Sequence, residues 1–94
     1  MEQVRLDAAH WQTADEVWSA LLAALGAPVW HGQNLDALAD SLGGGDLNTI
    51  NPPLTVVVHG AGSAGAEAQI AVEKIASVFR DLARAGVPIA WSQD

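Results

Sequence analysis

The fold is decided by residues 54–91, which read LTVVVHGAGSAGAEAQIAVEKIASVFRDLARAGVPIAW. The first six are an apolar, β-branched run, which predicts a buried strand. A long helical pattern follows and stops at Gly86. Its core-facing residues are Ile75, Val78, Phe79 and Leu82. Residues 87–91 are apolar again and predict a further strand. A strand, a helix and a strand in this order favour a parallel sheet covered by helices.

The residues before this unit add a strand and a helix. Residues 3–7 alternate between apolar and polar side chains, which indicates a strand. Thr13 and Glu16 have the spacing of a capping box, so we expect a helix over residues 14–25 that Gly26 ends. Its apolar stripe, which we expect to face the core, is Val17, Trp18, Leu21, Leu22 and Leu25.

A shorter helix is predicted to begin after Asn34, a good N-cap, and to end at the glycines of residues 43–45. Residues 43–53 are rich in Gly, Asn and Pro and predict a loop. The expected architecture is a small α/β domain, with a three-stranded parallel sheet packed against about three to four helices. At 94 residues, we expect residues 1–94 to form one domain.

The composition argues against several kinds of functional site and against a membrane segment. The chain has no Cys, and its three His lack the spacing of metal ligands, so we expect neither a metal nor a cofactor. No apolar run approaches the roughly 20 residues that span a bilayer. The first residues, MEQVRLD, lack the apolar segment of a secretory signal. We therefore expect a cytoplasmic protein that does not enter membranes.

The net charge of −7 is unevenly distributed, because residues 6–73 contain acidic residues but no Lys or Arg. Such a surface repels RNA and DNA, whose binding depends on basic groups that neutralise phosphates. It favours a basic partner. The alternative is that net acidity only keeps the protein soluble.

Gly60, Gly62 and Gly65 form a G-x-G-x-x-G pattern between a predicted strand and a predicted helix, which is the setting of a dinucleotide-binding loop. The chain is too short for a complete dinucleotide-binding fold, and the acidic residue such folds place after the next strand would have to be Asp94. We favour a tight strand-to-helix connection and keep a nucleotide-binding fragment as the alternative.

Asp36 and Asp40 are four residues apart on the short helix and therefore share one of its faces. Like charges at this spacing cost a helix roughly 0.2–0.5 kcal/mol. Asp40 also lies near the C-terminal end, where the helix dipole disfavours a negative charge, whereas Asp36 suits the first turn. The spacing alone does not distinguish a binding surface from an ordinary solvated face of the helix.

The segments PVWHGQNLDALADSL (28–42) and VFRDLARAG (78–86) resemble the barstar family, intracellular inhibitors of a secreted bacterial ribonuclease. The resemblance covers nearly the whole chain. It implies an inhibitor rather than an enzyme, which inserts its second helix and the preceding loop into the active site of a barnase-like, guanyl-type ribonuclease. The implied partner is a basic, extracellular microbial ribonuclease bound as a 1:1 heterodimer.

The resemblance also implies roles for individual residues. Asp40 matches the central acid that meets the cationic phosphate site of the enzyme, and Asp36 matches the other helix acid. Trp30 matches an aromatic residue that packs on the catalytic His, and Gly32 keeps the turn before the helix. Asp81 falls where the family has a Glu directed at the enzyme rim. The remaining residues of the implied surface are His31, Asn34, Leu35, Ala39 and Gly44.

Besides Asp81, the chain departs from the family pattern at two more of these positions. His31 replaces a second aromatic residue, and Ala39 stands where the family prototype has a Trp. The loop over residues 43–53 is also longer. We hypothesise that Ala39 and the glycines of residues 43–45 set the choice of target. An immunity protein against another basic toxin is the remaining alternative.

Overall fold

The computed structural model describes residues 2–27, 32–44, 48 and 51–94. Its elements, in chain order, are β1 (Glu2–Asp7), α1 (Ala14–Leu25), α2 (Leu35–Gly43), β2 (Leu54–His59), the short 3-10 helix η1 (Ala61–Ser63), α3 (Ala66–Arg84) and β3 (Ile89–Gln93). In these ranges, no helix is both long enough and apolar enough to cross a membrane.

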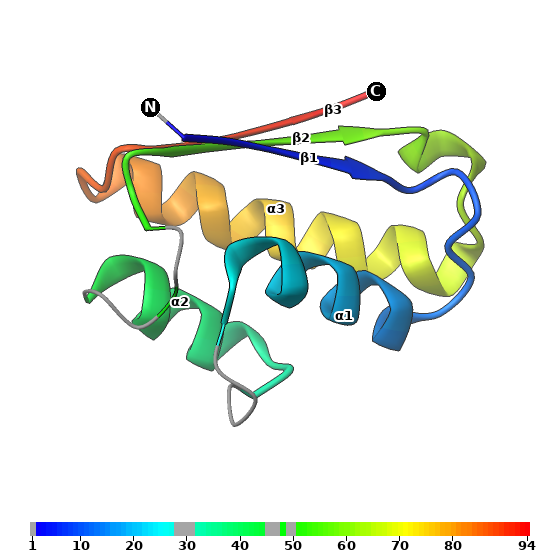
Figure 1. The fold of residues 1–94 in the computed structure, drawn as a ribbon, viewed down its shortest axis with the longest axis horizontal. Helices are drawn as coiled ribbons and strands as arrows, with labels where there is room; N and C mark the ends of the chain where they lie inside the picture. The colour runs from blue at the N-terminus through cyan, green and yellow to red at the C-terminus, as the bar shows by residue number, and fades with distance from the viewer. Residues whose placement is uncertain (1, 28–31, 45–47, 49–50) are drawn as a thin grey trace.

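The three strands form one parallel sheet in the order β1-β2-β3. Val4 of β1 pairs with Val56 of β2, and Val56 pairs with Trp91 of β3. The three long helices lie on the same side of the sheet (Figure 1). This arrangement confirms the predicted α/β fold and parallel sheet.

The helices cover only one face of the sheet, contrary to the expectation that β2 is buried along its length. Leu54, Val56 and Val58 are buried, whereas Thr55 and Val57 are partly exposed on the opposite face. Sequential parallel strands with crossovers of one handedness place every connecting helix on the same side. Among the described residues, the opposite face of the sheet therefore carries no helix.

The last strand begins at Ile89 rather than at Val87, so its predicted range of 87–91 is wrong by two residues at each end. The backbone N–H of Val87 donates to the carbonyl of Leu82 and so still belongs to the end of α3. Pro88 has no N–H to donate to a neighbouring strand. At the other end, Gln93 still pairs with β2.

The capping of α1 confirms the prediction for this helix. The Thr13 hydroxyl accepts a hydrogen bond from the Glu16 N–H at 3.2 Å, and the Glu16 carboxylate accepts one from the Thr13 N–H at 3.0 Å. Hydrogen bonds from the N–H groups of Gln12 and Thr13 hold the pKa of Glu16 below its ordinary value. Gly26 ends the helix with a φ of 66°, a conformation that glycine adopts without strain.

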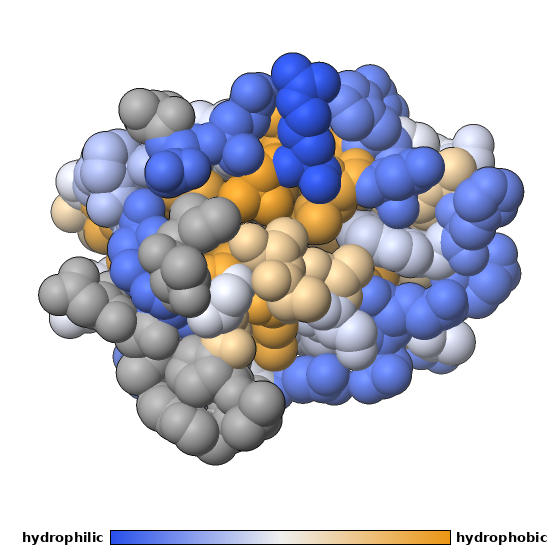
Figure 2. Space-filling model, in the orientation of Figure 1, coloured by the Kyte–Doolittle hydropathy of each residue, from blue (hydrophilic) through white to orange (hydrophobic). Residues whose placement is uncertain are grey.

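The core fills the space between the sheet and the helices. Its largest buried side chains include Phe79, Leu21, Leu25, Leu38, Leu54 and Ile75. Trp18 is buried, and the half-buried Trp91 lies 4.9 Å from Phe79 between ring centroids, so both Trp side chains pack as expected. Figure 2 shows apolar residues across the middle of one face of the molecule, with hydrophilic residues around them.

Candidate functional site

The start of α2 is fixed by Asn34. Its side chain accepts a hydrogen bond from the Ala37 N–H at 2.8 Å, which satisfies one of the free N–H groups of the first turn. Gly32 makes room for this cap, because a Cβ at that position would lie 2.6 Å from Nδ2 of Asn34. Both residues, which the resemblance assigns to a binding surface, thus have a structural role in orienting the helix.

The two sides of α2 differ in polarity and burial. Leu38, Ser41 and Leu42 are buried, and the helix packs against α3. Asp36 and Asp40 are exposed on the other side. We call these two side chains the acidic face of α2.

Neither carboxylate of the acidic face forms a hydrogen bond or ion pair with another described residue. The last turn of α2 contains no basic residue to offset Asp40. The local free-energy costs expected from the sequence, like-charge repulsion and an unfavourable helix dipole, therefore have no compensation within the described chain. The acidic face is available to cations of another molecule.

The C-terminal end of α2 is held closely against its surroundings. The N–H of Gly44 donates to the Asp40 carbonyl at 3.0 Å, and a Cβ at Gly44 would lie 2.9 Å from that same oxygen. A Cβ at Gly43 would lie 3.3 Å from Leu82 of α3. Glycine at position 43 therefore lets the helix end close to α3, and glycine at position 44 avoids a clash with the Asp40 carbonyl.

The segment after α2 is tied to the helix by buried polar groups. The Ser41 hydroxyl donates to the Leu38 carbonyl at 3.1 Å and accepts a hydrogen bond from Nδ2 of Asn48 at 3.4 Å. Nδ2 of Asn51 donates to the carbonyl of Asn48 at 2.6 Å. These bonds fix the described part of the loop beneath the helix and leave the acidic face unobstructed by it.

Asp81 lies on α3, the helix that packs against α2. It is exposed and accepts a hydrogen bond from Nη1 of Arg84 at 3.0 Å. An exposed pair of this kind contributes only about 0–1 kcal/mol to stability. A cation from a partner can therefore replace Arg84 at small cost, but Asp81 is not an unpaired charge as Asp36 and Asp40 are.

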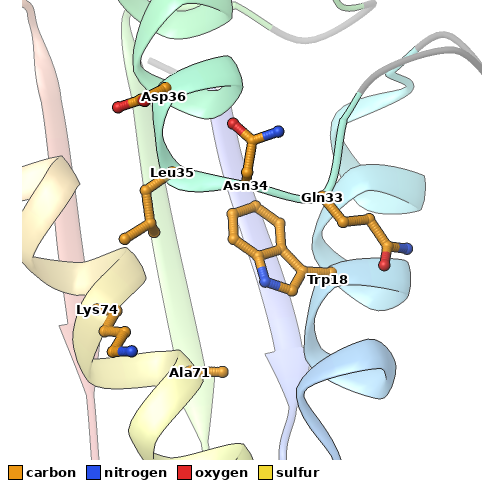
Figure 3. Close-up of a pocket in the computed structure, with 7 residues that line it drawn as sticks. All are labelled: Trp18, Gln33, Asn34, Leu35, Asp36, Ala71 and Lys74. Carbon is orange, nitrogen blue, oxygen red and sulfur yellow. The ribbon is translucent and has the colours of Figure 1, made fainter.

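A groove of about 460 Å³ opens at the N-terminal end of α2 (Figure 3). It is lined by Trp18, Gln33, Asn34, Leu35, Asp36, Ala71 and Lys74. The sequence pattern does not associate Trp18 and Lys74 with the acidic helix. No sequence signal could have done so, because the three helices that supply the lining meet only through tertiary packing.

The glycine-rich connection after β2 has a packing explanation. Gly60 has a φ of 77°, and a Cβ there would lie 3.0 Å from the Cβ of Ala9. A Cβ at Gly65 would lie 2.7 Å from Oε1 of Gln12, whereas a Cβ at Gly62 would meet nothing within 4 Å. The loop is therefore shaped by its contact with the β1–α1 connection, as the favoured interpretation expects.

The backbone at the start of the same loop forms a hydrogen bond with the carboxylate of Asp94. The Gly60 N–H donates to Oδ1 of Asp94 at 3.0 Å, and Nδ1 of His59 lies 3.1 Å from Oδ2. These contacts, the Gly60 bond first, lower the pKa of Asp94. A dinucleotide phosphate at this N–H would have to displace an internal carboxylate.

The other expected residues fall into two groups. Leu35 and Ala39 are half-buried beside the acidic face. Trp30 and His31 lie outside the described residues, as does part of the loop over residues 43–53. Among the described residues, no cluster of three or more His, Asp or Glu side chains is arranged to hold a metal ion.

Comparison with known proteins identifies a similar family over nearly the full chain. The family model described as Barstar (barnase inhibitor) matches residues 1–91. No curated protein matches the chain significantly. The family match spans β1 through most of β3 and includes α2 with its acidic face.

Proposed function

Because the chain belongs to the barstar family, a family of barnase inhibitors, we propose that it inhibits a basic, barnase-like ribonuclease by placing the acidic face of α2 in the active site of the enzyme. The observation that carries this proposal is the pair Asp36 and Asp40. Both carboxylates are exposed, and neither is paired with a described residue. Their like charges repel each other at this spacing, and the helix dipole disfavours Asp40 in addition.

The chemistry of the target explains why carboxylates serve as inhibitory groups. A ribonuclease concentrates cationic side chains to hold a phosphodiester and to stabilise the charge that develops in its transition state. Two opposite unit charges 4 Å apart attract each other by about 4 kcal/mol at an effective dielectric constant of 20. Two such pairs support tight binding, provided that hydrogen bonds offset the desolvation of each charge.

Each residue of the surface has a distinct proposed role. Asp40 enters the phosphate site of the enzyme, and Asp36 binds a cation beside it. Leu35 and Ala39 supply the half-buried surroundings that exclude water from these charges. Asn34, Gly32 and Gly44 hold the ends of the helix in the required geometry. Trp30, His31 and Asp81 contact the enzyme around the two central acids.

This mode of action requires no catalytic step by the inhibitor, in keeping with a family of inhibitors rather than enzymes. The target is a secreted microbial enzyme, and the complex contains one molecule of each protein. The inhibitor acts in the cytoplasm, where it protects the RNA of the cell that makes the ribonuclease.

An activity titration tests the proposal. Increasing amounts of the protein are added to a fixed amount of a barnase-like ribonuclease, and cleavage of an RNA substrate is measured. We expect activity to fall to zero at an equimolar ratio. The association rate should decrease as salt increases, because screening weakens the attraction between opposite charges. Undiminished cleavage at a large molar excess would contradict the proposed function.

A further inference from the structure

We propose that the groove between α1, α2 and α3 binds one carboxylate side chain of the partner ribonuclease, with the Trp18 indole N–H and the Lys74 ammonium as its donors. This inference rests on the proposed function and adds an oppositely signed contact to it. The acidic face contacts cations of the enzyme, whereas the groove binds one carboxylate of the enzyme next to those cations.

The first observation is the unpaired indole of Trp18. The residue as a whole is only 8% exposed, and none of the described residues accepts a hydrogen bond from its N–H, although the nitrogen is not among the fully buried atoms that lack a partner. The indole N–H of a largely buried Trp is usually turned toward a hydrogen-bond acceptor, which can be water or a polar group of another molecule. Figure 3 shows the indole lying across the groove with its nitrogen on the side of α3. The groove therefore contains a donor that lacks an acceptor.

The second observation is Lys74, the only Lys of the chain. It lines the groove from α3 and forms no ion pair with a described residue. Asp36 lines the groove as well, but its carboxylate is directed away from the indole (Figure 3). Lys74 and the indole N–H therefore face the groove as donors without a competing internal acid between them.

The surroundings favour a negatively charged occupant. The groove lies at the N-terminal end of α2, where the helix dipole favours an anion. Leu35 and Ala71 line it with apolar atoms, which suit the methylene groups of an acidic side chain. Because the groove borders Asp36, an acid next to the cationic cleft of the enzyme can reach it in the same complex.

Two variants and one control test the ribonuclease contact. Trp18→Phe removes the N–H and keeps an aromatic ring, and Lys74→Gln removes the charge. Each should raise the dissociation constant about fivefold, the loss expected for one hydrogen bond. Arg5→Gln changes the net charge as Lys74→Gln does, but on an exposed strand residue outside the groove, so it should change the constant less than about twofold.

A second measurement needs no ribonuclease. The four Trp give four indole resonances in a ¹H–¹⁵N spectrum, and Trp18→Phe identifies the one that belongs to Trp18. Sodium acetate should shift this resonance saturably, whereas sodium chloride at equal ionic strength should not. The acetate shift should disappear in Lys74→Gln.

The outcomes separate the two proposals. An indole resonance that does not respond to acetate, or unchanged dissociation constants for both variants, overturns the carboxylate groove and leaves the inhibitor function intact. Absence of any ribonuclease binding by the unmodified protein overturns the inhibitor function and with it the partner assigned to the groove. Thermal unfolding of each variant checks that the change lies in binding and not in folding.

Discussion

The side-chain oxygen of Asn34 lies 2.8 Å from the backbone nitrogen of Ala37 and accepts its hydrogen bond. Replacing Asn34 with Ala should lower the free energy of unfolding by about 1 kcal/mol, because an N–H of the first turn then loses its partner. Asn34→Ser should retain most of the stability. Urea denaturation of the three proteins measures the difference, and equal stability of all three would show that the cap is unimportant.

The glycines at positions 60 and 62 should respond differently to the same substitution. Gly60→Ala places a Cβ against Ala9 in a left-handed backbone conformation and should cost at least about 1–2 kcal/mol. Gly62→Ala meets open space, so the change should stay within about 0.5 kcal/mol. Denaturation midpoints compare the two. Equal losses of stability for the two variants would contradict the assignment of Gly60 to a strained and closely packed turn.

The helices were the most predictable elements, because their ends are encoded locally. Thr13, Glu16 and Gly26 define α1 through hydrogen bonds and a backbone conformation that involve only neighbours in sequence. Asn34 does the same for α2. The bounds of the last strand are harder to predict from the sequence. Val87 is apolar enough for a strand, but its N–H donates to the Leu82 carbonyl at the end of α3.

The candidate site was predictable only in part. The acidic face follows from the spacing of Asp36 and Asp40 on one helix. The groove beside it does not, since Trp18 and Lys74 belong to separate helices. The pairing of Asp94 with Gly60 likewise joins the end of β3 to the loop after β2, a contact that depends on the parallel sheet.

Asp94 should contribute to stability in a pH-dependent manner. Hydrogen bonds from the Gly60 N–H and His59 lower its pKa, so the native state binds this proton less readily than the unfolded state. Its contribution is present above the ordinary aspartate pKa and is lost as pH falls through the lowered native value. The difference in unfolding free energy between the unmodified protein and Asp94→Asn should therefore shrink on acidification. A difference independent of pH would contradict this assignment.

Ala39 should influence which ribonuclease is bound. It is half-buried beside the acidic face, so a larger side chain there alters the contact surface without replacing either acid. Ala39→Trp should change the ratio of dissociation constants for two different barnase-like ribonucleases by about tenfold, or about 1.4 kcal/mol. Parallel titrations of both enzymes measure the ratio. An unchanged ratio would remove Ala39 from the residues that set target choice.

The most direct test of the central claim compares Asp40→Ala with Asp15→Ala in ribonuclease inhibition. Both variants remove one exposed carboxylate from a helix, but only Asp40 belongs to the acidic face. We expect Asp40→Ala to raise the inhibition constant at least about 30-fold, or about 2 kcal/mol, and Asp15→Ala to leave it nearly unchanged. Equal inhibition by the unmodified protein and Asp40→Ala would contradict the claim that the acidic face of α2 occupies the active site.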